Sequence, residues 1–243
     1  PTEQKNQSAF EGVEWLDGNG PIGACYSSQS LTLALPGHYL TVYYPSDQTT
    51  NSLYDFVMTI AVFCGSSRGN DERFAQAAGA FGQYMASQGM DLVFGGGKVG
   101  LMGVVADAVL AGGREVYGVI PESLRDRELA HQGLTRLDVV SSMHERKALM
   151  ADMADAFVAL PGGPGTMDEI FEAWTWGQLG YHSKPCAFYN VDGYYNELLA
   201  FIRTMSGAGF LKPEYADMVI VKDQPNELVS ALKTYQPPSR KWS

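Results

Sequence analysis

The sequence is poor in cysteine: Cys25, Cys64 and Cys186 lie far apart, and no C-x-x-C pair is present. An odd, sparse set of this kind argues against a disulfide framework and against a structural zinc site. Cys64 and Cys186 fall in apolar stretches, where we expect buried and unreactive thiols. We therefore expect no metal site and a protein suited to a reducing cytoplasm.

Long apolar runs and positive charge are scarce as well. The longest runs, such as 157–161, are far shorter than the about 20 residues that a membrane-spanning helix needs. Lys and Arg number 17 against 27 Asp and Glu, which gives a formal net charge of −10. Because proteins that bind nucleic acid polymers usually carry a basic face, we expect neither a nucleic acid nor a membrane partner. A small phosphate ester remains a suitable ligand if local N–H groups and isolated basic side chains hold it.

From Met58 onward, short apolar runs alternate with amphipathic stretches of helix length. The runs show no alternation, as expected where helices cover both faces of a sheet. This order predicts an α/β fold, a Rossmann-like doubly wound parallel sheet of about seven strands with helices on both faces. The expected strands are 59–64, 91–94, 115–120, 137–140, 156–160, 186–189 and 218–221. The expected helices are 72–88, 100–111, 143–154, 166–179, 195–206 and 226–235.

Residues 1–57 differ from the rest of the chain. They are rich in Ser, Thr, Gly and Tyr and show no helical period, although 31–44 suits a hairpin or an extended segment. They do not resemble a signal peptide, because no cationic start leads into an apolar core. We expect a leader of unknown role at 1–57 and a Rossmann-type domain at 58–243. An added segment, an extended reading frame and a genuine appendage remain open for the leader.

Two glycine-rich loops follow the first two expected strands. The first, 65–69, offers the hydroxyl and N–H groups of Ser66 and Ser67 to an anion, although a plain strand-to-helix turn explains it equally well. The second, 95–100, formally matches the dinucleotide motif G-x-G-x-x-G but lacks the acidic residue that should hold a ribose. We therefore expect a loop at Gly97 that approaches a single nucleotide, and no NAD or other cofactor.

The third loop, P-G-G-P-G-T-M-D-E at 161–169, carries the strongest signal. Its glycines expose backbone N–H groups, and Thr166 lies where a helix start favours an anion such as phosphate. The acidic residues that follow could simply interact with the helix dipole, as acidic residues in a first turn ordinarily do. That explanation does not account for the glycine-rich loop before them. Before it, M-H-E-R-K at 143–147 opens a helix on the same side of the sheet. Neighbouring Arg and Lys usually form a solvated face, but here Arg146 is placed to bind a phosphate or a carboxylate.

These motifs resemble those of the LOG (Lonely Guy) family. Its signature pair, P-G-G-x-G-T-x-x-E and M-x-x-R-K, occurs intact at 161–169 and 143–147, and the likeness extends over about 58–235. Further matching segments are 63–67, 95–103, 118–121 and 175–180. The resemblance implies a homodimer that hydrolyses cytokinin riboside 5′-monophosphates, and often AMP, to the free base and ribose 5-phosphate. Family members are often labelled lysine decarboxylases, but no lysine here has a pyridoxal-phosphate context.

The resemblance also implies a set of site residues, with Arg146 and Glu169 catalytic. The substrate contacts that it implies are Glu128, Arg146, Lys147, Gly162, Gly163, Pro164, Gly165, Thr166, Met167, Asp168 and Thr175. Ser66 and Gly97 join them from the first two loops. Pro164 departs from the family, since many members have Tyr there and proline removes one N–H from the loop.

Breaking an N-glycosidic bond builds positive charge on the sugar, and Glu169 is suited to stabilise that charge. Glu172 lies one turn further along the same helix face. Arg146 cannot serve as an ordinary general acid, because a guanidinium does not release its proton. Two rivals remain: a non-catalytic nucleotide or molybdenum-cofactor carrier on the same scaffold, and an NAD-dependent oxidoreductase.

Overall fold

The computed structural model describes residues 23–27, 30–35, 38–43, 57–125 and 130–238. Contacts between residues divide the chain into two units, Pro1–Asp55 and Phe56–Ser243. In the first unit, β1 (Gly23–Ser27), β2 (Ser30–Leu35) and β3 (His38–Tyr43) form an antiparallel sheet in that order. The hairpin expected at 31–44 is confirmed as far as Tyr43, and Tyr44 lies outside the described residues.

The second unit holds a seven-stranded sheet in the order β10-β9-β8-β4-β5-β6-β7, with every neighbouring pair parallel. Its strands are β4 (Thr59–Phe63), β5 (Asp91–Phe94), β6 (Val116–Pro121), β7 (Arg136–Val140), β8 (Ala156–Ala159), β9 (Cys186–Tyr189) and β10 (Val219–Lys222). The parallel α/β sheet predicted from the sequence is confirmed, and each boundary agrees to within one residue.

The helices follow the predicted alternation with the strands. They are α1 (Glu72–Ser87), α2 (Gly100–Ala111), α3 (Glu122–Arg125), α4 (Met143–Met153), α5 (Pro164–Leu179), α6 (Asn196–Gly207), α7 (Pro213–Ala216) and α8 (Pro225–Lys233), with a 3₁₀ turn η2 (Val191–Gly193). The short α3, α7 and η2 were not expected, because one turn leaves no periodic pattern in a sequence. Helix α5 begins at Pro164 and not at Thr166, since proline is well suited to the first helical position.

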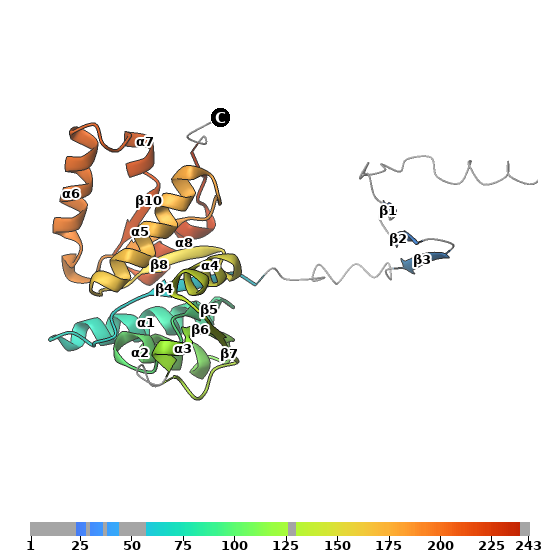
Figure 1. Cartoon of the computed structure of the whole chain (residues 1–243), viewed down its shortest axis with the longest axis horizontal. Coiled ribbons are helices and arrows are strands. Elements are labelled where there is room, and N and C mark those ends of the chain that lie inside the picture. The colour runs from blue at the N-terminus through green and yellow to red at the C-terminus, as the bar shows by residue number, and fades with distance from the viewer. Residues whose placement is uncertain (1–22, 28–29, 36–37, 44–56, 126–129, 239–243) are drawn as a thin grey trace, which may run out of the picture. The chain divides into compact units, whose positions relative to one another are not determined.

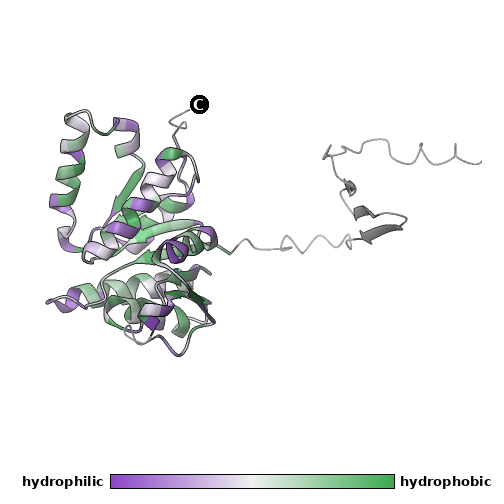
Figure 2. Ribbon diagram, in the orientation of Figure 1, coloured by the Kyte–Doolittle hydropathy of each residue, from purple (hydrophilic) through white to green (hydrophobic). Residues whose placement is uncertain are grey.

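Helices cover both faces of the sheet (Figure 1), and the side chains of each strand point alternately to one face and to the other. In β4, Ile60 and Val62 pack into one core cluster, together with α1, α2 and α8. Ala61 and Phe63 point to the other face, into the cluster formed with α4, α5, α6 and α7. Figure 2 shows the strands between the helix layers as mostly hydrophobic. The domain is therefore a three-layer sandwich with a strand sheet buried on both faces.

The strand order creates a crevice at the carboxyl ends of the central strands β4 and β8. The chain runs from β4 outward to β7 and then returns to β8, on the other side of β4. In open α/β sheets, ligands bind outside the carboxyl ends of the strands at such a switch point. The loops after β4 and β8, the first and third glycine loops, meet there, as the hydrogen bond from the Gly65 N–H to the Pro161 oxygen shows at 3.0 Å.

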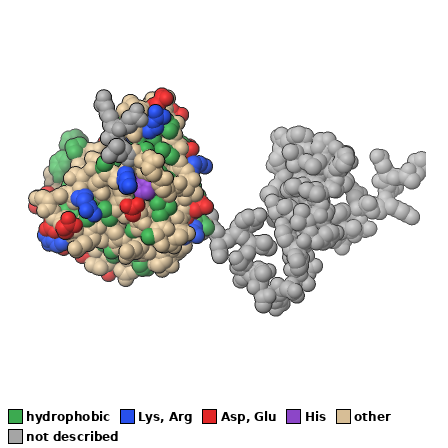
Figure 3. All heavy atoms as spheres, turned by 90° about the horizontal axis from the view of Figure 1, so that it is seen from below, with side chains coloured by type: hydrophobic (Ala, Val, Ile, Leu, Met, Phe, Trp, Pro, Cys, Tyr) green, Lys and Arg blue, Asp and Glu red, His purple; other side chains and the backbone are tan. Residues whose placement is uncertain are grey.

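On the face of the domain drawn in Figure 3, acidic and basic side chains are interspersed, and neither sign of charge forms a large patch. Among the described residues, no helix is long and apolar enough to cross a bilayer.

Candidate active site

A cavity of about 280 Å³ opens where β4 and β8 end, and we call it the central cavity. It brings together eight of the residues predicted from the sequence: Ser66, Arg146, Gly163, Pro164, Gly165, Thr166, Asp168 and Glu169. Cys64 and Gly65 form part of its wall, and Met102, Leu124 and Met143 supply apolar side chains. Segments nearly 100 residues apart in the chain therefore converge on one hollow.

The start of α5 presents unused N–H groups to this cavity. Gly163 is the N-cap and has no side chain that could accept a hydrogen bond from the first turn. Pro164 occupies the first helical position. Within the described residues, no hydrogen bond employs the N–H groups of Gly165 or Thr166. Because a helix start directs such groups and a positive dipole end outward, it suits an anion. Pro164 costs the helix little, since a first-position N–H is not needed for helix bonding, but it removes one donor from the site.

The glycines of this loop fall into two kinds. A Cβ on Gly162 would overlap the Thr166 side chain, so that position needs glycine for the protein's own packing. A Cβ on Gly163 or Gly165 would meet nothing within 4 Å, and neither residue has a positive φ. The fold itself therefore does not require glycine at 163 or 165. Open space above unused N–H groups is what a bound anion would fill.

Arg146 enters the cavity from α4 and is held by backbone oxygens. Ser142 caps α4 by accepting the Glu145 N–H at 3.1 Å, which places Arg146 in the first turn. The arginine is only 5% exposed. Its Nε donates to the Val119 oxygen at 3.0 Å and its Nη2 to the Gly95 oxygen at 3.2 Å. The Val119 carbonyl within β6 and the Gly95 carbonyl directly after β5 hold the guanidinium. Of the two partners that the sequence suggested for Arg146, a phosphate or a carboxylate, the structure provides a carboxylate, that of Glu169.

The second glycine loop builds this arginine site and supports the first loop. A Cβ on Gly95 would overlap Arg146 Nη2. Gly100 has a φ of 61° and lies against the backbone of the first loop, where the Leu101 N–H donates to the Gly65 oxygen at 3.0 Å. Gly97 is buried, bridges to Ala130, and lies outside the linings of the two cavities described here.

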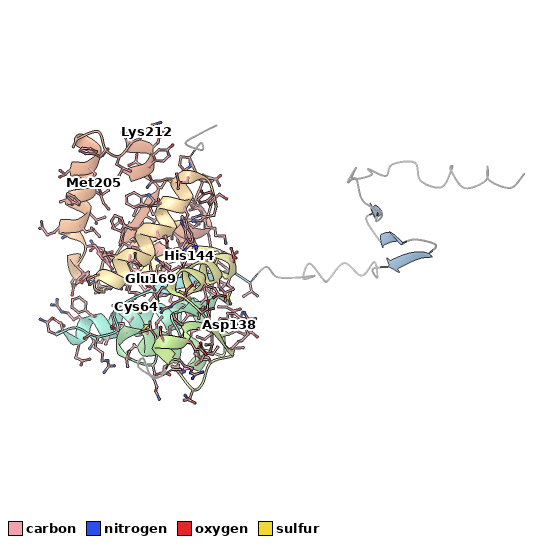
Figure 4. All side chains as sticks on the ribbon, in the orientation of Figure 1. Cys64, Asp138, His144, Glu169, Met205 and Lys212 are labelled. Carbon is pink, nitrogen blue, oxygen red and sulfur yellow. The ribbon has the colours of Figure 1, made fainter. Side chains whose placement is uncertain are left out.

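Glu169 faces the arginine from α5. Its side chain is 13% exposed, and its Oε1 lies 4.0 Å from Arg146 Nη2. Figure 4 places Glu169 and Cys64 close together at the centre of the domain. Burial, and secondly the negative charge of Glu169, raise the pKa of the Cys64 thiol far above its ordinary value. Cys64 is therefore a neutral wall residue and no nucleophile, in keeping with the unreactive thiol expected from the sequence.

Lys147 lies beside the cavity and outside its lining. Its Nζ is 2.8 Å from a Glu172 oxygen and 3.1 Å from an Asp168 oxygen, and its side chain is 15% exposed. Burial lowers the pKa of Lys147, but hydrogen bonds and charge from Glu172 and Asp168 outweigh it and raise the pKa. This lysine is a charged bridge between α4 and α5.

The remaining predicted contacts lie apart from the central cavity. Met167 packs on the core beneath α5. Thr175 is exposed and donates its hydroxyl to the Phe171 oxygen at 2.7 Å. Glu128 lies outside the described residues. Gly162 instead lines a second, adjoining cavity of about 320 Å³.

This adjoining cavity shares Gly65, Ser66 and Gly163 with the central one, and its far wall is Phe74 and Tyr194. These two aromatic residues could not be predicted from the sequence, because nothing in a local pattern shows that α1 and the segment after β9 meet at the loops. Among the described residues, no group of three or more His, Cys, Asp or Glu is arranged to hold a metal ion.

Comparisons with known proteins show what this chain is similar to. A family model described as "possible lysine decarboxylase" matches residues 102–232. The probable cytokinin riboside 5′-monophosphate phosphoribohydrolase LOGL2 of Oryza sativa subsp. japonica is 46% identical over 182 residues, covering 75% of each chain. The cytokinin riboside 5′-monophosphate phosphoribohydrolases LOG3 and LOG7 of Arabidopsis thaliana are 47% and 48% identical over 178 residues. These matches cover 73% of this chain and 83% and 82% of those proteins.

Solved structures with similar folds are more distant in sequence. The molybdenum cofactor carrier protein of Chlamydomonas reinhardtii has a TM-score of 0.57 at 21% identity, covering 73% of this chain and 96% of that one. The molybdenum cofactor binding protein of Rippkaea orientalis has a TM-score of 0.57 at 20% identity, covering 75% and 98%. At such identities the likeness shows the shared fold alone.

Proposed function

The chain belongs to the LOG family of cytokinin riboside 5′-monophosphate phosphoribohydrolases, and on that premise we propose that it hydrolyses the N-glycosidic bond of such nucleotides and of AMP. The products are the free base and ribose 5-phosphate. One observation carries this proposal: a helix start with unused N–H groups and an Arg146–Glu169 pair line the same cavity. The first suits the 5′-phosphate and the second suits the reacting sugar.

The phosphate is the anchor in this proposal. The N–H groups of Gly165 and Thr166 and the positive end of α5 bind its oxygens, with open space at Gly163 and Gly165 to admit them. A protein with a net charge of −10 has no general attraction for a nucleotide. Recognition must therefore come from these few local donors.

Glu169 acts on the sugar. As the bond between C1′ and the base nitrogen breaks, its electron pair leaves with the base and positive charge grows on the ribose. The Glu169 carboxylate stabilises that charge and orients a water molecule. The water oxygen bonds to C1′, and one water proton ends on the base nitrogen.

Arg146 positions this carboxylate. Two backbone carbonyls fix the guanidinium, so that its charge stays directed at Glu169 across 4.0 Å. An arginine cannot supply the proton that the base takes up. Cys64, a neutral thiol beside Glu169, does not compete as a nucleophile.

The decarboxylase description fits the residues less well. A lysine that bonds covalently to a carbonyl carbon must be able to lose its proton. Lys147 is instead held charged by two carboxylates, and no lysine lines either cavity among the described residues. A carrier on the same scaffold would bind a nucleotide without needing a carboxylate beside a buried arginine.

The test compares AMP with adenosine under identical conditions by release of ribose 5-phosphate or ribose. We expect kcat/KM to be at least about 100-fold higher for AMP, because several charge-assisted bonds of roughly 1.5–3 kcal/mol each depend on the phosphate. Equal cleavage of both would contradict the assignment of the third loop. Cleavage of neither, with AMP bound intact, would favour the carrier. N6-substituted adenosine monophosphates in the same assay define the base preference.

We further propose a homodimer in the cytoplasm. The resemblance to the family and the exposed Leu179 and Tyr181 at the end of α5 support an interface between copies. Two free, buried thiols, Cys64 and Cys186, suit a reducing compartment. Light scattering on the purified chain tests the dimer, and fractionation of cells tests the compartment.

A further inference from the structure

At the start of the third glycine loop, the carbonyl oxygens of four consecutive residues, 160–163, all accept hydrogen bonds. The Leu160 oxygen accepts from the Tyr195 hydroxyl at 2.5 Å, and the Gly162 oxygen accepts from the Tyr194 hydroxyl at 2.7 Å. The Pro161 oxygen accepts from the Gly65 N–H at 3.0 Å. The Gly163 oxygen accepts from the Met167 N–H at 3.2 Å. Two of the four donors are thus side chains of neighbouring tyrosines from a distant segment.

This arrangement decides which backbone groups face the anion. In a trans peptide the C=O and the following N–H point in opposite directions. Tyr194 holds the Gly162 oxygen, and this fixes the Gly163 N–H on the other side of the same peptide plane. Within the described residues, no hydrogen bond uses the Gly163 N–H, and Gly163 lines both cavities. A carbonyl turned toward a phosphate would instead repel it.

The tyrosines are themselves held in place. The Tyr195 N–H donates to Asn190 Oδ1 at 2.8 Å. Asp192 sits at a φ of 48°, a conformation that non-glycine residues rarely adopt, and pairs with Arg73 at 2.7 Å. The Tyr194 ring packs edge-on against Phe74 of α1, with ring centres 5.6 Å apart. The turn after β9 is therefore joined to α1 by an ion pair and by a ring contact.

We propose that Tyr194 is a positioning residue for phosphate recognition, with Tyr195 as its buried support. It acts through the Gly162 carbonyl and not by contact with the substrate, by keeping the Gly163 N–H directed at the phosphate. This inference rests on the proposed function, because it takes a phosphate as the ligand of the loop. The sequence did not single out either tyrosine.

The experiment compares Tyr194→Phe with the wild type. The ring and its contact with Phe74 remain, and only the hydroxyl is lost. We expect the KM for AMP to rise about 3- to 10-fold, as the loss of one hydrogen bond predicts, with kcat within about 2-fold. The inhibition constant of inorganic phosphate should rise by the same factor, while kcat/KM for adenosine stays unchanged. Tyr84→Phe is the matched control, because Tyr84 lies near the other end of α1 and lines neither cavity, and it should change none of these values.

Two results would overturn the inference. An unchanged KM for AMP together with an unchanged phosphate inhibition constant would mean that the hydroxyl does not set the loop. An equal loss for AMP and adenosine would mean a general structural role. Should the wild type fail to cleave AMP, the proposed function falls, whereas calorimetric titration with inorganic phosphate still tests the tyrosine directly.

Discussion

Arg146 and Glu169 illustrate how a residue's role depends on what holds it. Arg146 donates two hydrogen bonds, to the Val119 and Gly95 carbonyls. A buried charge kept by backbone oxygens is costly to move, and it therefore gives the neighbouring carboxylate a fixed partner. Gly95 belongs to the same unit, because any side chain there would displace the guanidinium.

Replacing Glu169 by Gln should leave the fold intact and remove most hydrolysis. The substitution keeps the size of the side chain and removes the charge that stabilises the sugar. Loss of one catalytic carboxylate typically lowers the rate by ~10²–10⁴-fold, measured as kcat for AMP. Glu197→Gln is the matched control, since Glu197 is also a helical glutamate but lines neither cavity. Activity of Glu169→Gln within a few-fold of wild type would exclude the catalytic role.

Replacing Gly165 by Ala should separate stability from binding. A Cβ there meets no protein atom, and alanine in a helix is favoured over glycine, so the free energy of unfolding should rise by up to about 1 kcal/mol. The same methyl group occupies the space assigned to the phosphate, so the KM for AMP should rise about 10-fold or more.

Gly207→Ala serves as the control for this prediction. Gly207 ends α6, and a Cβ there also meets nothing within 4 Å. It should raise stability without changing KM. If Gly165→Ala also leaves KM unchanged, the phosphate does not lie at this helix start.

At the scale of elements, α4 and α5 form the frame of the site. Lys147 of α4 joins Asp168 and Glu172 of α5, and Lys184 donates to the Ala151 oxygen in the last turns of α4 at 2.7 Å. Helix α5 ends at Gly180, whose φ of 81° provides the left-handed stop that such helices use. These links fix the distance between Arg146 and Glu169, which come from different helices.

The segment after α5 should make stability sensitive to acid. His182 Nε2 lies 2.9 Å from the Ala173 oxygen, and its Nδ1 accepts the Lys184 N–H at 3.1 Å, so the folded state holds the neutral ring. Burial lowers the pKa of His182 from 6.5; the Ala173 carbonyl opposes this shift, and the charge of Lys184 adds to it. The unfolded chain therefore binds more protons, and the stability from this residue is present above pH 6.5 and lost as the pH falls below it.

Melting temperatures between pH 7.5 and 5.5 check this expectation. His182→Gln keeps a donor and an acceptor but does not titrate, so its melting temperature should fall less across this range. Equal slopes for the two proteins would show that His182 does not carry the effect.

At the scale of the whole molecule, the buried residues of both core clusters, among those that the structure describes, all follow Met58. None of the strands described in the leader, β1 to β3, belongs to the sheet between them. The Rossmann-type unit therefore has the buried surface that a domain requires.

A chain that begins at Met58 should have the melting temperature, oligomeric state and kcat/KM of the full chain. Met58 must be kept, because its side chain packs on the first core cluster and its carbonyl accepts the Asp91 N–H at 3.0 Å. Calorimetry, light scattering and the AMP assay measure the three properties. Aggregation or a large loss of activity would show that residues 1–57 contribute to the domain.

The sequence by itself determined the elements and the parts of the site that lie close along the chain. Uninterrupted apolar runs predicted the buried strands. The helix ends also follow from local residues, since Gly89 and Gly113 lie just after α1 and α2 with φ of 73° and 76°. The third loop, and a helix starting within two residues of the observed start of α5, could be predicted because their backbone geometry depends on neighbouring residues. Glycine content, proline position and the following carboxylates all lie within nine residues.

Only the tertiary structure decided what each loop does. The second loop looked like a nucleotide loop, yet Gly95 makes room for Arg146, 51 residues away, and Gly100 packs on the first loop. Tyr194 reaches Gly162 across 32 residues, and Lys147 reaches Asp168 across 21. Such contacts follow from the order of strands in the sheet, which brings distant carboxyl ends together. A local pattern carries no record of that order, because its hydrophobic period is the same wherever the strand is placed.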